Sequence, residues 1–206
     1  MLNSGGAGNN AAIATLLDYD GYIDLSGEGL HRRGYRLQAG EAPLRENVAA
    51  GILLRAGWPQ LAAEGAALLD PMCGSGTFVI EAALIAADMA AGLRRDYFGF
   101  KGWKGHDPAL WERLRMAAAA RVREREAARA PLRGSDADPR AVRVARDNAE
   151  RAGVAAWVEF AQAPLAQAQP SAPRGLLCTN PPYGVRLEDR ETARALHREL
   201  GGVMRD

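Results

Sequence analysis

Alternation between short apolar runs and helix-forming stretches is the feature that most restricts the fold of this chain. Four runs are short and apolar enough for buried strands, and they lie at 66–70, 132–135, 156–160 and 175–179. Helical patterns occupy 43–56, 77–91, 108–130, 139–152 and 191–204. Strands that alternate with helices are joined by crossover connections and pair in parallel. We therefore predict an α/β fold of the Rossmann-like type, with a mostly parallel sheet.

Two of the predicted strands are followed by loops of unusual composition. The first strand ends in DPMCGSG at Asp70–Gly76, and the fourth ends in NPPYG, which begins at Asn180. Ligands of open parallel sheets bind outside the carboxyl ends of the strands. Because both loops are expected at that edge, the sequence predicts one cleft that they share.

The first loop has the properties of a site for a cationic, nucleotide-like ligand. Gly74 and Gly76 allow a tight turn and a close approach of a ligand to the backbone, and the helix that follows begins with free N–H groups. No Gly-Lys-Ser/Thr follows, so the loop does not match a phosphate-binding P-loop. The carboxylate of Asp70 would repel a pyrophosphate, but it suits the ammonium and sulfonium groups of S-adenosylmethionine.

Asp136, at the end of the second strand, extends this predicted cofactor site. A carboxylate in this place can accept hydrogen bonds from ribose hydroxyls, whereas Asp138, ahead of Pro139, is expected to cap the next helix. The predicted cofactor-binding residues are Asp70, Pro71, Met72, Cys73, Gly74, Ser75, Gly76, Asp136 and Ala137. No metal site is predicted, because the two cysteines form neither a metal-binding pattern nor a disulfide framework.

The Asn180-Pro181-Pro182-Tyr183 loop indicates what the site modifies. The lone pair of a base amino group is delocalised into the ring, so that its nitrogen is a poor nucleophile. The carboxamide oxygen of Asn180 can accept one N–H and the carbonyl of Pro181 the other, in positions that the prolines fix. Tyr183 offers a face on which an extruded base can stack. We predict direct displacement with these four residues as the catalytic set, without a metal or a covalent nucleophile.

With these motifs in place, the chain resembles the class I methyltransferases that modify amino groups of bases. Blocks such as SGEGLHRRGYR, APLRENVAAGILLRAGW, GFKGWKGHDPALW and GSDADPRAVRVARDNAERAG extend the resemblance over residues 18–206. They are similar, in order, to blocks of the bacterial 23S rRNA guanine-N2 methyltransferase family. The resemblance implies S-adenosylmethionine as cofactor, guanine N2 in 23S rRNA or a pre-ribosomal particle as substrate, and a cytoplasmic location. It also implies that Cys73 lines the cofactor site and that Asn180–Tyr183 hold the guanine.

The family resemblance also implies a domain organisation. Residues 1–12 are expected to be a flexible lead-in, and 13–36 a remnant of a preceding RNA-binding THUMP domain with its linker. Residues 37–206 are expected to be a partial methyltransferase domain with an insertion at about 92–130. The family's Asp after the third strand is absent near Pro164, so no residue is assigned to adenine. About three further strands complete this fold class, and we expect a missing C-terminal segment or another copy to cover the edge of the fourth strand.

Charge gives no general sign of an RNA partner, because the formal net charge is only +1. A basic RNA-binding surface must therefore be local. The candidates are Arg32, Arg33, Arg36, Arg94, Arg95, Lys101 and Lys104. Aromatic residues are interleaved with the basic residues of the insertion. These aromatic residues are expected to anchor the insertion to the core rather than to stack on bases, and they are Phe98, Phe100, Trp103 and Trp111.

Other functions remain open at the level of the sequence. The NPPY loop alone also fits an adenine-N6 DNA methyltransferase or, less well, a protein-glutamine methyltransferase, since each methylates a poorly nucleophilic nitrogen. A non-catalytic RNA-binding module is an alternative from another class. No apolar run is long enough to span a bilayer, so no membrane association is predicted.

Overall fold

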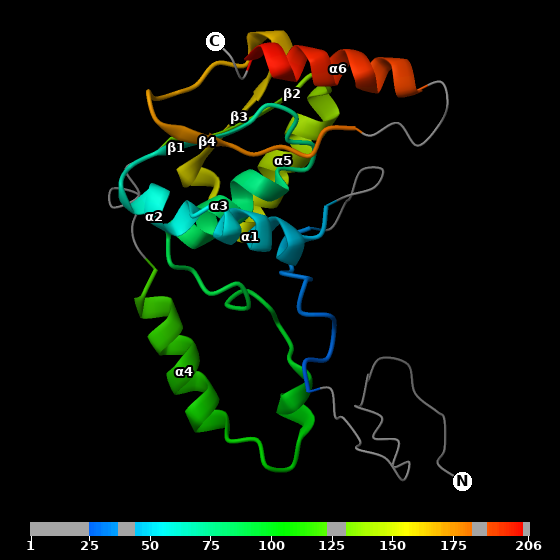
Figure 1. The fold of residues 1–206 in the computed structure, drawn as a ribbon. Coiled ribbons are helices and arrows are strands. Elements are labelled where there is room, and N and C mark those ends of the chain that lie inside the picture. Colours follow the sequence, from blue (N-terminus) through cyan, green and yellow to red (C-terminus); the bar gives the residue numbers. More distant parts are fainter. Residues whose placement is uncertain (1–24, 37–43, 123–130, 183–188, 204–206) are drawn as a thin grey trace, which may run out of the picture.

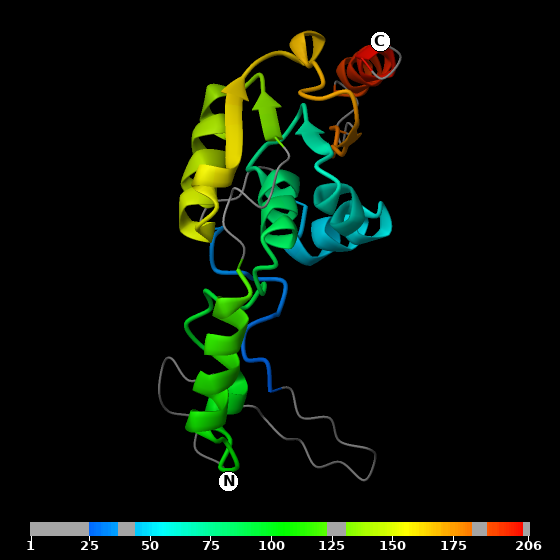
Figure 2. The same cartoon turned by 90° about the vertical axis from the view of Figure 1, so that its left-hand side faces the viewer.

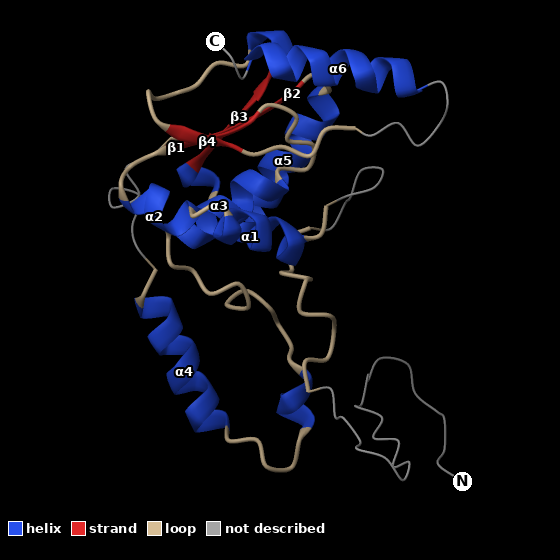
Figure 3. Ribbon diagram, viewed as in Figure 1, coloured by secondary structure: helices blue, strands red, loops and turns tan. Residues whose placement is uncertain are grey.

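A four-stranded sheet forms the centre of the molecule. The computed structural model describes residues 25–36, 44–122, 131–182 and 189–203. The strands are β1 (Ala67–Asp70), β2 (Leu132–Asp136), β3 (Val158–Gln162) and β4 (Gly175–Leu177), in the spatial order β3-β2-β1-β4. All three pairings are parallel. The prediction of a Rossmann-like α/β fold with a parallel sheet is confirmed (Figure 3).

Helices cover the sheet mainly on one side. The helices are α1 (Glu46–Arg55), α2 (Trp58–Ala63), α3 (Thr77–Ala86), α4 (Pro108–Ala120), α5 (Pro139–Ala152) and α6 (Asp189–Val203). Short 3-10 turns lie at Gly99–Gly102, Ala155–Trp157 and Leu165–Gln167. In Figure 1, α1, α2 and α3 lie below the sheet and α6 lies above it. No helix in the described part of the chain is long and apolar enough to cross a membrane.

Helix α3 is the central element of the core. Every residue from Thr77 to Leu84 is buried, because the helix packs against α1, α2, α5 and the sheet at once. Phe78, Val79 and Ile80 join Leu68 of β1 in the main hydrophobic cluster, and each such side chain stabilises the fold by about 1.5–3 kcal/mol. The loop that precedes α3 is therefore attached to a helix that is buried along most of its length.

The element boundaries differ from the sequence predictions at backbone positions that a periodicity pattern does not reveal. The predicted helix 43–56 is followed by a second helix, α2, because Gly57 takes a left-handed conformation with φ 75° and Pro59 opens a new first turn. Helix α3 ends at Ala86 rather than at residue 91, and Asp88 has φ 53°. Strand β3 begins at Val158 because Ala155–Trp157 forms a 3-10 turn.

Two further predicted elements lie partly outside the described residues. Of the predicted strand at 13–25, only Leu25 lies within them, and it belongs to no strand. Helix α4 ends at Ala120, and the predicted continuation at 123–130 lies outside the described residues.

A projection leads away from the sheet, and it consists of residues 25–32 lying along residues 93–121 (Figures 1 and 2). The amide of Phe100 donates to the carbonyl of Leu25 at 2.7 Å, and the Arg95 guanidinium donates to the carbonyls of Ser26, Glu28, Gly29 and Arg32. Both segments are therefore held together by backbone carbonyls and one arginine.

The aromatic residues of the projection pack on one another. Phe98 and Phe100 stack with ring centroids 5.4 Å apart, and Trp111 contacts both rings edge-on at 5.2 and 4.9 Å. They hold the projection together instead of joining the main hydrophobic cluster, so the expected anchoring to the core is wrong in that detail. Trp103 departs further, because 59% of it is exposed.

Strand β4 lies at one edge of the described sheet. The amide of Cys178 donates to the carbonyl of Leu69 on β1 at 3.0 Å, so the amide of Leu177 points to the opposite side. No described strand pairs with that side. We expect the Leu177 amide to exchange rapidly with solvent in a dilute sample of this chain, and more slowly at concentrations where copies associate. Hydrogen exchange measured across a dilution series tests this, and full protection of β4 in a dilute monomer would contradict it.

Candidate active site

The two loops singled out in the sequence meet at the same edge of the sheet. Strands β1 and β4 are parallel neighbours, with Leu69 in register with Leu177. The loops that follow them therefore leave the sheet side by side at its carboxyl edge. Thr179, directly before Asn180, is close enough to the carboxylate of Asp70 to lower its pKa. One cleft between the loops, as expected from the sequence, is consistent with this geometry.

Hydrogen bonds tie the glycine loop to β2 as well as to β1. The amide of Cys73 donates to the carbonyl of Ser135 at 2.9 Å, and the amide of Gly74 donates to Oδ2 of Asp136 at 2.9 Å. The other carboxylate oxygen of Asp136 accepts the amide of Asp138 at 3.0 Å. Asp136 is half-buried and keeps further lone pairs for a ligand. It thus orders the loop in addition to its predicted role as acceptor for ribose hydroxyls.

Asp70 is the most perturbed acid of the site. Only 2% of the residue is exposed, and this burial raises the pKa of its carboxyl group to about 7, with a smaller contribution from the nearby charge of Asp136. The Thr179 side chain and the amide of Met72, at 3.2 Å, oppose the shift. The Thr179 hydroxyl lies near the carboxylate without a hydrogen bond of regular geometry to any described residue. A cation beside Asp70 would restore the ionised form.

The loop leaves room for a ligand on its outer side. A Cβ atom built on Gly74 would meet no heavy atom within 4 Å, whereas one built on Gly76 would lie 2.9 Å from the Phe160 ring. Gly76 therefore faces the protein interior and Gly74 faces open space. A buried carboxylate, a half-buried carboxylate and open space beside an ordered backbone together fit a ligand with a cationic group and hydroxyl groups.

Neither cysteine near the site is suited to act as a nucleophile. Burial raises the pKa of the Cys73 thiol far above its usual range, and burial raises that of Cys178 to about 12. The charge of Asp70 adds to both shifts. Both thiols therefore stay protonated at neutral pH, and a protonated thiol is a poor nucleophile.

The two glycines of the loop give a matched pair of substitutions. Gly76 has φ 83° and is crowded by Phe160 and Ala145, at 2.9 and 3.0 Å from an added Cβ, so Gly76→Ala is expected to destabilise the fold by about 2–4 kcal/mol. Gly74 has φ 52° with open space around it, so Gly74→Ala is expected to cost only about 1 kcal/mol. Its methyl group should instead reduce cofactor affinity. Urea unfolding and calorimetric titration measure the two effects, and equal losses of stability would contradict the assignment.

The described part of the NPPY loop presents its polar groups outward. Asn180 and Pro182 are exposed and Pro181 is half-buried. Asn180 makes no hydrogen bond to any other described residue, so its carboxamide is available to a ligand. Tyr183 lies outside the described residues, and its predicted stacking role stays a prediction.

The site contains residues that sequence reasoning did not single out. Thr179 could have been found from its place between β4 and the NPPY loop. Asn148 is completely buried and donates from Nδ2 to the carbonyl of Ser75 at 2.9 Å. Its signal was present in the sequence, since it is a polar residue in the apolar stripe of Val142, Ala145 and Ala149 on α5.

Three of the predicted RNA-binding arginines have partners within the protein. Arg33 forms an ion pair with buried Glu81 at 3.4 Å. Arg36 is almost fully buried and donates to the carbonyl of Leu44 at 2.7 Å and to the hydroxyl of Thr77. Arg95 binds the four carbonyls named above. These contacts occupy donors that RNA would need, and RNA binding by these three side chains stays a prediction.

The other predicted basic residues are more accessible. Arg32 is exposed and lies 3.7 Å from Glu28. Arg94 is exposed and its guanidinium lies directly against Gly153, at the end of α5, where a cation is favoured. Lys101 donates to the carbonyl of Asp96 at 3.4 Å, and Lys104 is exposed. Among the predicted RNA-binding residues, the accessible positive charge therefore lies on the projection.

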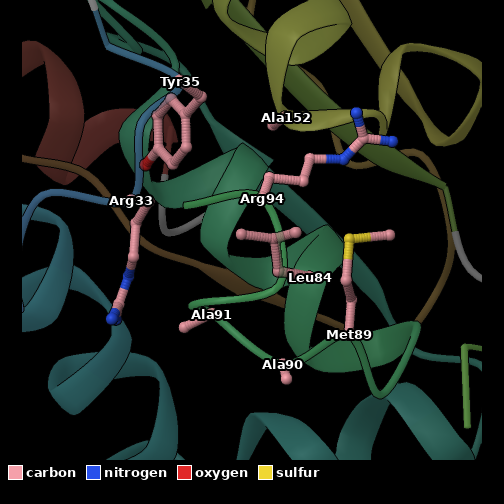
Figure 4. Close-up of a pocket in the computed structure, with 8 residues that line it drawn as sticks. All are labelled: Arg33, Tyr35, Leu84, Met89, Ala90, Ala91, Arg94 and Ala152. Carbon is pink, nitrogen blue, oxygen red and sulfur yellow. The ribbon is translucent and has the colours of Figure 1, made fainter. Parts of the chain in front are cut away.

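A small pocket lies away from the site. Figure 4 shows Arg94 and Met89 on one side of it and Tyr35 and Arg33 on the other. Its floor includes Leu84, near the end of α3. Since α3 rises about 1.5 Å per residue, this pocket is separated from the glycine loop by most of the helix. It is not part of the candidate active site.

Fold and site together define a class I methyltransferase domain. The sequence model of one protein family, described as the RMKL-like methyltransferase domain, matches residues 33–206. The chain belongs to this family. Membership of a family like the one expected from the motifs is thus confirmed, and so is S-adenosylmethionine as the cofactor.

Similar proteins include ribosomal RNA methyltransferases. The chain is 55% identical over 188 residues to ribosomal RNA large subunit methyltransferase K/L of Pseudomonas paraeruginosa, and 53% identical to that of Pseudomonas aeruginosa. In both comparisons 89% of this chain is matched, but only 26% of the relative. The chain thus spans about a quarter of the length of these curated relatives.

Solved structures show the same fold. A putative methyltransferase complexed with SAH, SMU.472, is 39% identical with a TM-score of 0.78, covering 88% of this chain and 45% of that one. A protein from Listeria monocytogenes described as a predicted N6-adenine-specific DNA methylase is 40% identical, also with a TM-score of 0.78, covering 89% of this chain and 46% of that one. These proteins are what the chain resembles in three dimensions.

Proposed function

We propose that this chain is the catalytic part of an enzyme that methylates guanine N2 in 23S ribosomal RNA with S-adenosylmethionine. The observation that supports this most is the adjacency of two loops at neighbouring strand ends. One carries the buried carboxylate of Asp70, and the other carries the exposed carboxamide of Asn180, which makes no hydrogen bond to another described residue. The names of the curated relatives support ribosomal RNA as the substrate.

On this proposal, the glycine loop and Asp136 hold the cofactor. Asp70 provides the negative charge for its cationic half, Asp136 accepts hydrogen bonds from its ribose, and the open space beside Gly74 receives it. The bound cofactor supplies a methyl group on a positively charged sulfur. The remaining predicted lining residues, from Pro71 to Ser75 and Ala137, contribute backbone and shape.

The NPPY loop acts on the amino group of the base. The Asn180 carboxamide oxygen accepts one N–H of the amine, and the carbonyl of Pro181 accepts the other. Both contacts favour a pyramidal nitrogen, whose lone pair is then exposed to the methyl group. Because the prolines restrict the backbone, the two acceptors are positioned before the base arrives. The proton leaves to solvent after transfer, so no strong base is required.

RNA is expected to contact the projection as well as the cleft. Arg32, Arg94, Lys101 and Lys104 provide positive charge there, and contacts to phosphates fix the register of an RNA without reading its sequence. On this view the substrate is a folded RNA that reaches from the projection to the cleft. We also propose that the unpaired edge of β4 is covered by a further segment of the protein or by a second copy of the chain.

Methyl transfer to defined nucleic acids tests the proposal. Labelled methyl groups from S-adenosylmethionine are expected in 23S rRNA that lacks this modification, at guanine N2, and not in DNA. Transfer to adenine in DNA would instead favour the second candidate, an adenine-N6 methyltransferase, which the description of the Listeria relative brings forward. Binding of RNA without any binding of cofactor would favour a non-catalytic module.

A further inference from the structure

A partly buried series of three hydrogen bonds connects the segment before α1 to the glycine loop through α5. The carbonyl of Tyr35 accepts a hydrogen bond from Nε of Arg151 at 2.8 Å. A second nitrogen of the same guanidinium donates to Oδ1 of Asn148 at 2.7 Å, and Nδ2 of Asn148 donates to the carbonyl of Ser75 at 2.9 Å. Three elements distant in sequence are thus linked by three successive hydrogen bonds.

This series of hydrogen bonds fixes the orientation of the Asn148 amide. Asn148 is completely buried, and either end of its carboxamide could face the loop on grounds of shape alone. Because Arg151 is a donor only, it selects the oxygen end and leaves the nitrogen end for Ser75. The arginine is itself oriented by the carbonyl of Tyr35. The Tyr35 side chain is buried, and its phenol hydroxyl donates to Oε1 of Glu81 at 3.0 Å.

The Ser75 carbonyl is the point where the glycine loop turns into α3. The neighbouring residue, Gly76, packs against Phe160 and Ala145 without room for a side chain. On the other side of the loop, Gly74 is held by Asp136 and Cys73 by the carbonyl of Ser135. Asn148 provides the attachment to α5, so the loop is fastened to a strand at one end and to a helix at the other.

We infer that Asn148, oriented by Arg151, is a positioning residue that holds the glycine loop in the conformation that binds the cofactor. This inference rests on the proposal that the glycine loop is the cofactor site. On this inference both side chains act through the loop, without direct contact with the cofactor. A loop that is ordered before binding loses less conformational entropy when the ligand arrives. Loss of these hydrogen bonds is therefore expected to weaken cofactor binding.

Asn148→Asp is the sharpest test, because the two side chains have nearly the same shape. An ionised carboxylate keeps its contact with Arg151 but offers an acceptor, instead of a donor, to the Ser75 carbonyl. The buried cluster therefore remains paired on one side while the loop loses its attachment. We expect the dissociation constant for S-adenosylhomocysteine to rise at least tenfold, measured by calorimetric titration at a temperature where each variant is fully folded. Asn47→Asp, an exposed position on α1, is the control for the chemical change.

Arg151 gives a second test that does not depend on the folding of Asn148→Asp. Arg151→Met removes both hydrogen bonds of the guanidinium, and it is expected to weaken S-adenosylhomocysteine binding several-fold. Arg151→Lys keeps a donor and is expected to recover part of the loss. A purely structural role would give equal affinities once each variant is folded, and that result would overturn the inference. If the unaltered chain fails to bind S-adenosylhomocysteine, the proposed site itself is wrong, whereas normal binding by both sets of variants rejects only the positioning role.

Discussion

Replacement of Asn180 by Ala is expected to reduce methyl transfer by about 10²–10³-fold or more, with cofactor affinity nearly unchanged. The reason is that the carboxamide is an acceptor for the amine in the reacting geometry, and loss of one such preorganised contact has effects of this size in other enzymes. The side chain is exposed and makes no hydrogen bond to another described residue, so its removal should not disturb the fold.

Two measurements on the same variant separate the contributions. Single-turnover transfer of labelled methyl groups to unmodified 23S rRNA by the intact protein reports the chemical step, and calorimetric titration with S-adenosylhomocysteine reports the cofactor site. Asn47→Ala, on the exposed face of α1, serves as the control for an asparagine deletion. Turnover retained within a factor of three in Asn180→Ala would remove the role given to the NPPY loop.

Replacement of Asp70 by Asn is expected to change cofactor binding and stability in opposite directions. Burial raises the pKa of this carboxyl group from its ordinary value of 3.8 to about 7. A cationic ligand prefers the ionised carboxylate, so the affinity of the unaltered protein for S-adenosylmethionine should fall as the pH drops from 7 to 5.5, by up to tenfold per pH unit. In Asp70→Asn this dependence should be absent, and affinity at pH 7.5 should be about 10²-fold lower.

The free energy of unfolding changes with pH in the opposite direction to cofactor affinity. Because the pKa of Asp70 is higher in the folded than in the unfolded state, the folded protein binds the extra proton between about pH 4 and 7. The contribution of this group to stability is therefore largest below its unfolded pKa and is lost as the pH rises through 7. At pH 8 an ionised, buried Asp70 destabilises the fold, so Asp70→Asn is expected to raise the free energy of unfolding by about 1–4 kcal/mol.

Urea unfolding at pH 5 and pH 8 checks this second effect. The gain from Asp70→Asn should be clear at pH 8 and small at pH 5, where the carboxyl group of the unaltered protein is already neutral. Asp96→Asn, at an exposed position of the projection, is the matched control. If Asp70→Asn is less stable than the unaltered protein at pH 8, the ionised carboxylate stabilises the fold, and the expectation is wrong.

Much of the fold and of the chemistry followed from local sequence. Helical periodicity, the Pro139 start and the Gly153 end located α5 to the residue, because caps and periodicity are properties of neighbouring residues. The Asp70 loop and the NPPY loop were recognised for the same reason, since each needs only a few consecutive residues to state its chemistry. Where local backbone conformation departs from the average, as at Gly57 and Asp88, the boundaries shifted.

Contacts between distant residues were beyond that reach. Sequence placed both loops at the carboxyl edge of a sheet, but only the strand order β3-β2-β1-β4 made them neighbours. Arg33, Arg36 and Arg95 read as free basic residues, whereas their guanidinium groups bind partners up to 69 residues away in the chain. The buried position of Asn148 likewise depends on a partner in another element.

The sequence by itself thus determined which chemical groups the protein has and on which strand ends they stand, because periodicity and loop composition are local properties. Tertiary structure alone decided that the two loops follow neighbouring strands, that burial raises the pKa of Asp70, and that Asn148 of α5 donates a hydrogen bond to the glycine loop. The physical reason is that strand order, desolvation and buried hydrogen bonds depend on packing between segments that no short stretch of sequence specifies.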